Sequence, residues 1–247
     1  MVNRLINDKV TSTRSFESLY PYDSHFLNIR GHDLHYLDQG QGKPVVMVHG
    51  NPTWSFYFRH QINTLSALNY RCIVPDHIGC GLSDKPFPSE YHYTLKSRVN
   101  DLDALINSLD LDEKISLIVH DWGGMIGLAW AIDRLDRVDK IVITNTSGFF
   151  LPQGKSLPLR LWLIKYLSFF AVPAVLGFNL FSRAALTMAT AGKLSPKVKK
   201  GLVEPYNSWQ NRIATLKFVQ DIPISESDTS YSIVDHVDRN LTRLKDS

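Results

Sequence analysis

Short apolar runs separated by polar turns recur through the first part of the chain. Residues 44–48, 72–75, 115–120 and 140–145 each predict a strand, and the first three are apolar enough to lie inside a sheet. Apolar residues return at helical spacing from Leu95 to Leu109, which predicts an amphipathic helix. Strands that alternate with helices indicate an α/β fold, with a parallel sheet covered on both faces.

One strand ahead of these runs has a different pattern. Residues 33–38 alternate apolar and polar positions, as a half-exposed strand does. The sequence Gln39-Gly40-Gln41-Gly42 then predicts a turn. We therefore expect strands 33–38 and 44–48 to pair as a hairpin that leads into the sheet.

The pattern changes after Gly148, where several helical patterns follow with no clear strand. We expect a core over residues 1–148, a helical cap over 149–220 above the carboxyl edge of the sheet, and a polar return segment over 221–247. Within the cap, residues 166–181 are apolar and uncharged. Pro173 and nearby basic residues make a membrane-spanning helix a poor interpretation. We expect this run to line an apolar pocket, with interfacial lipid contact as the alternative.

Composition removes several function classes. A net charge of +3 without a basic run gives no reason to expect nucleic acid or a membrane surface as a partner. Cys72 and Cys80 provide neither a disulfide framework nor a metal-binding spacing. Residues 1–30 lack the apolar stretch of a signal peptide. We expect a cytoplasmic protein with no metal and no cofactor.

The most informative chemistry lies at Asp121. A buried strand precedes it, Gly123 and Gly124 permit a sharp turn, and a helix is predicted to follow. This is the strand–turn–helix context of a nucleophile elbow, with an aspartate where serine is usual and Val119 where a glycine is usual. A carboxylate there can displace a leaving group from a saturated carbon, or open a strained ring, and become an alkyl ester. The simpler alternative is an aspartate that only caps the helix.

Two residues are placed to stabilise a developing negative charge beside Asp121. The backbone N–H of Trp122 follows the nucleophile, and its indole N–H could donate to a departing anion. Asn51 follows strand 44–48, so its backbone N–H and its side-chain amide could donate to the same charge. The alternatives are a packing tryptophan and a turn asparagine before Pro52.

Other polar residues near these strands are expected to be structural. His120 should point away from Asp121 as a satisfied core histidine, because neighbouring strand residues face opposite sides. His49 should support its own loop. Asn145 ends a strand where some enzymes place a catalytic acid, but an amide cannot serve as one.

Three motifs resemble the haloalkane dehalogenase family of α/β-hydrolases, and the resemblance spans nearly the whole chain. They are His49-Gly50-Asn51-Pro52-Thr53-Trp54-Ser55, the run from Pro75-Asp76-His77 to Asp84-Lys85-Pro86, and His120-Asp121-Trp122-Gly123-Gly124. Residues 205–213 and 218–223 look most like the β-lactone decarboxylases of long-chain olefin biosynthesis. Epoxide hydrolases also use an aspartate but usually have an aromatic residue where Asn51 stands, so they rank third.

The resemblance implies an α/β-hydrolase fold, in which Asp121 is the nucleophile and Asn51 and Trp122 stabilise the leaving group. It implies a hydrophobic small-molecule substrate, and conversion of a β-lactone to an olefin is the preferred function. Release of halide from a haloalkane is the alternative. Assembly with other olefin-pathway enzymes is a further expectation, whereas membrane contact is not.

The resemblance also implies a histidine and an acid on loops after the cap, and neither has a credible counterpart up to Ser247. His236 lies in a polar stretch and is expected on the surface. We expect the last strands of the sheet to be absent from this chain. A fragment of a longer product is favoured over a natural short form, for which a catalytically silent binding scaffold is the alternative function.

Overall fold

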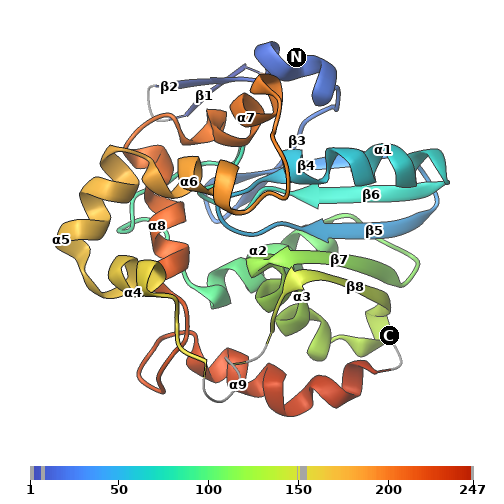
Figure 1. Cartoon of the computed structure of the whole chain (residues 1–247). Helices are drawn as coiled ribbons and strands as arrows, with labels where there is room; N and C mark the ends of the chain where they lie inside the picture. The colour runs from blue at the N-terminus through green and yellow to red at the C-terminus, as the bar shows by residue number, and fades with distance from the viewer. Residues whose placement is uncertain (1–2, 7–8, 149, 151–154, 246–247) are drawn as a thin grey trace.

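The computed structural model describes residues 3–6, 9–148, 150 and 155–245. Its centre is a six-stranded sheet in the order β3-β4-β6-β5-β7-β8 (Figure 1). The pairs of β5 with β6, β5 with β7 and β7 with β8 are parallel, and the two pairs that involve β4 are antiparallel. The strands are β3 (His25–Ile29), β4 (His32–Gln39), β5 (Lys43–Val48), β6 (Tyr70–Pro75), β7 (Ile115–Asp121) and β8 (Val138–Thr146).

The central strands are apolar on both faces because helices cover both faces. In β5, Val46 and Val48 pack into a cluster on one side of the sheet, and Val45 and Met47 pack into a second cluster on the other. This alternation is the two-residue period of a strand. The predicted strands over 44–48, 72–75, 115–120 and 140–145 are therefore confirmed, with the α/β fold class.

The predicted hairpin between strands 33–38 and 44–48 is wrong. Strand β4 pairs with β3 on one side and with β6 on the other, so β6 lies between β4 and β5. The glycines of the intervening turn have positive φ values, 83° at Gly40 and 94° at Gly42. They carry the chain across the start of β6, where a side chain on either glycine would overlap the backbone of residues 69–70.

Helices on the two faces follow the predicted alternation. Helix α2 confirms the helix expected over 95–109, and α3 begins directly after Asp121. Helix α1 packs against β6, while α2 and α3 pack against each other on the opposite face (Figure 1). Their bounds are α1 (Arg59–Ala67), α2 (Leu95–Ser108) and α3 (Trp122–Ile132).

Among the described residues after β8, only helices and loops occur. The arrowheads of β5, β6 and β7 point toward α4, α5 and α8, so these helices lie at the carboxyl ends of the strands (Figure 1). The division into a core over 1–148, a cap over 149–220 and a return segment stays a prediction. The elements are α4 (Leu159–Tyr166), α5 (Ser168–Ala171), the π-helix η4 (Val172–Gly177), α6 (Leu180–Met188), α7 (Pro196–Val203), α8 (Ile213–Gln220) and α9 (Tyr231–Asn240).

Two long-range hydrogen bonds tie these helices to the loop after β5. The indole Nε1 of Trp54 donates to the carbonyl of Gly201 at 2.8 Å. The hydroxyl of Tyr206 donates to the carbonyl of Thr53, also at 2.8 Å. The loop that carries Asn51 is therefore held by α7 and by the segment that follows it.

The segment after residue 220 is more ordered than the sequence pattern suggests. We expected a polar return, but α9 buries Val234 and Val237 and packs against α3. These valines lie three residues apart, which places them on one face of the helix. The final strand of the described sheet, β8, forms its edge and leaves Val142 and Ile143 exposed.

Candidate active site

Asp121 stands at the junction of β7 and α3 with a strained backbone. Its φ of 52° and ψ of −126° are rare for a residue with a side chain. The turn is compact because Gly123 approaches the carbonyl of Val48 and Gly124 approaches Thr146, where added side chains would overlap these atoms. The predicted strand–turn–helix is therefore present, and its two glycines are required by close approach.

The loop after β5 meets this turn. The backbone N–H of Asn51 donates to Oδ1 of Asp121 at 2.6 Å. The backbone N–H of Trp122 also hydrogen-bonds the Asp121 carboxylate. Gly50 lies so close that a side chain there would overlap the carboxylate of Asp121 and the nitrogen of Trp122. The structure thus brings together all three predicted site residues, Asp121, Asn51 and Trp122.

The side chain of Asn51 makes a contact that the sequence does not reveal. Its Nδ2 donates to the carbonyl of Thr215 on α8 at 3.0 Å. Its Oδ1 is buried and accepts no hydrogen bond from any described residue. Donation from this amide to a leaving group stays a prediction, and it would share the amide with α8.

Trp122 is 93% buried, since only 7% of its surface is exposed. Its ring centroid lies 5.3 Å from that of Phe218 on α8. The guanidinium of Arg98 lies over both rings, 3.7 Å from the Phe218 centroid and 5.7 Å from that of Trp122. A cation behind an aromatic pair is attracted by the ring faces and fixes their positions. The indole of Trp122 as an anion donor stays a prediction.

Arg98 is a residue that our sequence interpretation missed. It is fully buried on α2, donates to the carbonyl of Tyr93 at 3.1 Å and pairs with Asp221 at 3.4 Å. Its Nε and Nη2 have no partner in the part of the chain that the structure describes. The sequence could have predicted that Arg98 is buried, because position 98 lies one turn after Leu95 on the apolar face of the predicted helix.

The charge state of Asp121 follows from its surroundings. Burial raises the pKa of the Asp121 carboxyl above its usual value, because a charged group loses hydration. The backbone N–H groups of Asn51 and Trp122 oppose this rise by hydrogen-bonding the carboxylate. A carboxyl with a shifted pKa at the end of a parallel strand marks Asp121 as a candidate functional residue.

The histidines near the site differ from one another. The interpretation of His49 is confirmed, since its Nδ1 bonds the carbonyl of Gly50 at 2.9 Å and its Nε2 accepts from the backbone of His77 at 3.1 Å. The expectation of a satisfied His120 is wrong. Its ring stacks on Tyr57 at 4.3 Å, and its buried Nδ1 has no partner among the described residues. Burial lowers the pKa of His120.

A second buried carboxylate, Asp76, supports the loop after β6. It accepts from Nδ1 of His35 at 2.8 Å and from the backbone of Ser55 and Leu82 at 2.7 and 2.9 Å. Burial alone would raise the pKa of Asp76, but these partners lower it to about 2. The sequence signal for it was its position directly after a buried strand.

Two polar residues remain, and Asn145 lies on β8 between Thr144 and Thr146, the strand partners of His120 and Asp121. Asn145 is exposed near the end of β8, with a φ of 42°. His236 is on the surface of α9, as predicted, where its Nε2 lies 2.9 Å from Asp133.

Comparison with known proteins identifies the family of this chain. A family model described as alpha/beta hydrolase fold matches residues 43–215. The chain belongs to the α/β-hydrolase family. Within this family it is haloalkane dehalogenase-like, which agrees with an aspartate at the elbow.

Among similar α/β-hydrolases are two proteins named cis-3-alkyl-4-alkyloxetan-2-one decarboxylase. The chain is 48% identical to the one from Shewanella oneidensis, over 92% of this chain and 71% of that protein. It is 41% identical to the one from Xanthomonas campestris pv. campestris, over 92% of this chain and 78% of that protein. A haloalkane dehalogenase from Mycolicibacterium paratuberculosis is more distant, at 31% identity over 88% and 72% of the two chains.

Solved structures agree with this family. Haloalkane dehalogenase DpaA from Paraglaciecola agarilytica has a TM-score of 0.74 at 25% identity, over 96% of this chain and 77% of that one. Haloalkane dehalogenase DatA from Agrobacterium tumefaciens has a TM-score of 0.77 at 24% identity, over 87% and 73%. The second likeness shows the fold alone.

Proposed function

We propose that this protein converts a β-lactone with alkyl groups on its two saturated ring carbons into an alkene and carbon dioxide. One observation carries the proposal. A partly buried elbow aspartate with backbone donors occurs in a chain 48% identical to a cis-3-alkyl-4-alkyloxetan-2-one decarboxylase. The β-lactone is a strained ring, and its oxygen-bearing saturated carbon is open to attack by a carboxylate.

In the first step, the carboxylate of Asp121 attacks that ring carbon. The Asn51 N–H already holds Oδ1, so Oδ2 is the attacking atom. The bond from Oδ2 to carbon forms as the ring C–O bond breaks, and the electron pair leaves with the released carboxylate. The intermediate is an alkyl ester of Asp121 that carries a β-carboxylate.

In the second step, the β-carboxylate leaves as carbon dioxide. The electron pair of the broken C–C bond forms the double bond, and the Oδ2–C bond breaks to regenerate the Asp121 carboxylate. The backbone N–H groups of Asn51 and Trp122 stabilise that returning charge, as an oxyanion hole does. These two reaction steps consume no water and move no proton, so they need no general base.

The route fixes the geometry of the product. Backside attack inverts the ring carbon and places the Asp121 oxygen opposite the substrate carboxylate. Loss of both groups from that arrangement leaves the two alkyl groups on the same side. A cis-lactone should therefore give a cis-alkene.

The test is incubation of the purified protein with a cis-3,4-dialkyl β-lactone, with alkene and carbon dioxide measured by gas chromatography and mass spectrometry. We expect cis-alkene from the wild type and none from Asp121→Asn. A β-hydroxy acid, or alcohol in stoichiometric amount, would show hydrolysis and contradict the proposal. Retained alkene formation in Asp121→Asn would contradict the role of Asp121.

A second candidate function is dehalogenation, favoured by the 31% identity to a haloalkane dehalogenase. Asp121 would then displace halide from an alkyl halide. Halide release together with a mass increase on Asp121 equal to the alkyl group would support dehalogenation. Halide release by a protein that does not convert the lactone would favour dehalogenation over decarboxylation. A protein that binds both compounds reversibly and changes neither would be a binding scaffold.

A further inference from the structure

The helices that follow β8 expose large apolar side chains on the surface. Leu159 is 72% exposed, Phe169 81% and Phe178 70%. We call this surface the aromatic face, and it consists of Leu159, Trp162, Tyr166, Phe169, Phe178 and Leu180. Soluble monomers rarely leave so many large apolar residues exposed on neighbouring helices, so this surface calls for a partner.

Helix α4 shows that the exposure is systematic. Leu159, Trp162 and Tyr166 recur at intervals of three and four residues, which places them on one side of the helix. Ile164 and Lys165 are buried against the rest of the molecule. The outward side of α4 is therefore the apolar one, the reverse of an ordinary surface helix.

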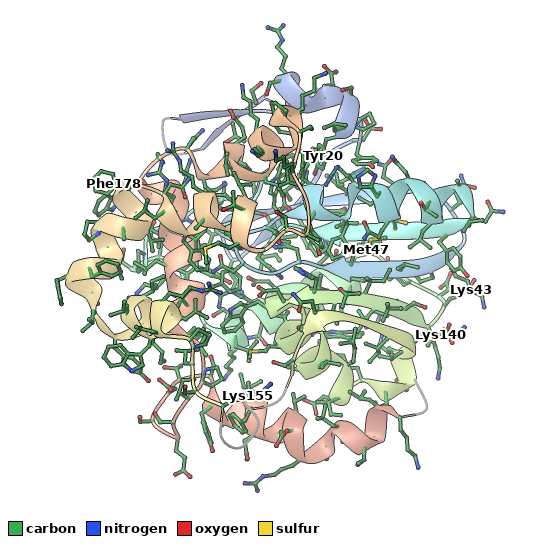
Figure 2. All side chains as sticks on the ribbon, viewed as in Figure 1. Tyr20, Lys43, Met47, Lys140, Lys155 and Phe178 are labelled. Atoms are coloured by element: carbon green, nitrogen blue, oxygen red, sulfur yellow. The ribbon has the colours of Figure 1, made fainter. Side chains whose placement is uncertain are left out.

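The next segment corrects an expectation from the sequence. Residues 166–181 were expected to line an apolar pocket, and Val175 and Leu176 are indeed buried. Phe169 and Phe178, however, point outward, and Phe178 lies at the opposite end of the molecule from Lys43 and Lys140 (Figure 2). One apolar run thus serves both the interior and the surface.

Charge on the same segment is one-sided. Residues 155–203 contain eight lysines and arginines and no aspartate or glutamate, although the whole chain has a net charge of only +3. Seven of these eight basic residues are exposed. The eighth, Lys165, is buried and pairs with Asp228 at 2.8 Å. An exposed, unbalanced positive charge complements a partner that is negative.

Shape adds a third observation. In the described residues no single helix is long and apolar enough to cross a membrane. The bent pair of Leu159–Tyr166 and Ser168–Gly177, which meet at 100°, meets that test only when taken together. Two short apolar helices at a right angle can lie along an interface without spanning it.

We propose that the aromatic face docks on the surface of a bilayer that contains anionic lipids. Trp, Phe and Leu side chains enter the boundary between headgroups and acyl chains, while Arg160 and Arg183 meet lipid phosphates. A lipid surface fits better than an acidic protein, because large exposed apolar side chains occur together with two short apolar helices that bend by 100° and with exposed basic residues.

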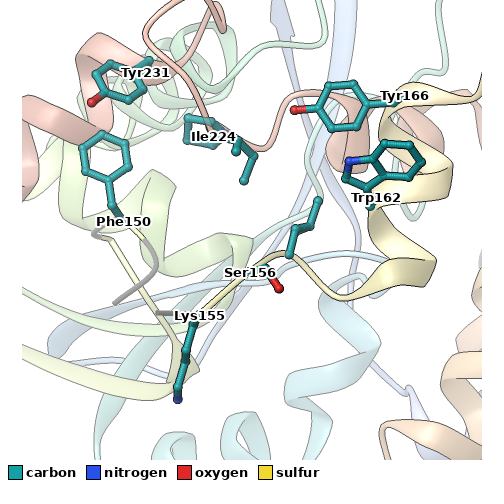
Figure 3. A pocket seen from close by; sticks show the side chains of 9 residues that line it. Phe150, Lys155, Ser156, Trp162, Tyr166, Ile224 and Tyr231 are labelled. Atoms are coloured by element: carbon teal, nitrogen blue, oxygen red, sulfur yellow. The ribbon is translucent and has the colours of Figure 1, made fainter. Parts of the chain in front are cut away.

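A pocket opens beside this face. It has a volume of about 500 Å³, and Trp162 and Tyr166 of the aromatic face also line it, opposite Phe150, Ile224 and Tyr231 (Figure 3). A substrate with two alkyl chains partitions into lipid. We therefore infer that such a substrate enters the protein from the bilayer through this pocket. This last point rests on the proposed function, whereas docking itself does not.

The test is co-sedimentation of the purified protein with vesicles. We expect binding to vesicles of phosphatidylcholine and phosphatidylglycerol in equal parts, and weak binding to phosphatidylcholine alone. Phe169→Ser with Phe178→Ser should weaken binding at least about tenfold. Arg160→Gln with Arg183→Gln should weaken it and reduce its sensitivity to salt, since screening acts on the charge contribution.

The control variants also replace exposed apolar residues by serine and exposed basic residues by glutamine, but at the opposite end of the molecule. Leu68→Ser removes another exposed apolar residue, and Lys43→Gln with Lys140→Gln removes two exposed charges. We expect both to bind vesicles as the wild type does. All variants change exposed side chains, and unfolding curves should show that each is folded.

Several results would overturn the proposal. They are failure to bind anionic vesicles, equal binding to neutral ones, and equal loss in the control variants. A change of oligomeric state in the lipid-free aromatic variants, seen by sedimentation equilibrium, would assign the face to protein contact instead. Turnover of a short-chain soluble lactone should be unchanged in the aromatic variants, so failure of docking and failure of the proposed chemistry are distinguishable.

Discussion

The buried Asp76 and the partly buried Asp121 lie at the ends of the strands on either side of β5, and their surroundings are opposite in kind. Asp76, after β6, accepts three hydrogen bonds and faces His35, and its pKa is lowered to about 2. Asp121, at the end of β7, accepts hydrogen bonds from backbone N–H groups and from no side chain of the described residues, and burial raises its pKa. The ionised form of the same side chain is strongly favoured in one loop and disfavoured by burial in the other.

Hydrogen-bond partners explain why the pKa is lowered at Asp76 and raised at Asp121. Hydrogen bonds to a carboxylate, and a cation beside it, stabilise its charge and reduce its tendency to attack carbon. Asp76 accepts three such hydrogen bonds, one of them from a ring nitrogen of His35, which suits a residue that ties the loop after β6 to β4 and to Ser55. Asp121 has the oriented donors that an ester carbonyl needs and no side-chain cation bonded to it among the described residues.

The largest expected effect separates the two residues by activity. Asp121→Asn should reduce alkene formation from the β-lactone by at least about 10⁴-fold, because an amide is not a nucleophile here. Its unfolding free energy should stay equal or rise, since a poorly stabilised charge has been removed. Gas chromatography of the alkene and urea denaturation measure the two quantities. A variant that lost stability like an Asp76 variant would refute the distinction.

The second effect acts on the donors around Asp121. Gly50→Ala places a methyl group against the Asp121 carboxylate and the Trp122 nitrogen, so it should displace the oxyanion donors. We expect about 100-fold slower alkene formation, similar to the loss of one such donor. Gly192→Ala is the matched control, because a side chain there meets nothing within 4 Å. Unchanged turnover in Gly50→Ala would show that the donors are unimportant.

The third effect should appear in stability. Asp76→Asn leaves at least one of its three buried donors without an acceptor and removes the charge opposite His35. The free energy of unfolding should fall by about 3 kcal/mol. Urea denaturation at neutral pH measures it. A loss no larger than that of an exposed substitution would mean that the network is not structural.

The fourth effect is a pH dependence specific to Asp76. Its pKa falls from a usual value of 3.8 to about 2 on folding, so the folded state favours the ionised form. The contribution to stability, about 2 kcal/mol, is complete above pH 4 and is lost as pH falls toward 2. The difference in urea midpoint between wild type and Asp76→Asn should therefore shrink over that range. A constant difference would contradict the lowered pKa.

The smallest effect concerns the pH profile of catalysis. Because the pKa of Asp121 is raised, its carboxylate is protonated at a higher pH than an ordinary aspartate. Alkene formation should fall on the acid side with an apparent pKa above the usual 3.8. Initial rates at saturating lactone, measured while circular dichroism shows the protein folded, test this. An acid limb below that value would contradict it.

Local patterns predicted the central elements well. The apolar runs of β5, β6 and β7 and the spaced apolar residues of α2 are properties of neighbouring residues, which a sequence displays directly. Asp121, Asn51 and Trp122 could be placed together because the carboxyl ends of parallel strands meet at one edge of a sheet. The roles of these residues remain predictions.

Pairing between distant residues could not be predicted in the same way. The supposed hairpin of β4 with β5 is wrong because β6, some 30 residues later, inserts between them. The bond from Asn51 to Thr215, the place of Arg98 behind Trp122 and the stacking of His120 on Tyr57 all depend on tertiary contacts. The outward orientation of Phe169 and Phe178 likewise has no signature in composition.

The bond between the Asn51 amide and Thr215 also has a consequence for the order of events during synthesis. The two residues are 164 positions apart in the chain. A ribosome that adds about 5–20 residues per second needs about 8–30 seconds to make the intervening segment. Until then the loop beside Asp121 lacks its support from α8, so the surroundings of the Asp121 carboxylate are complete only after α8 has been made.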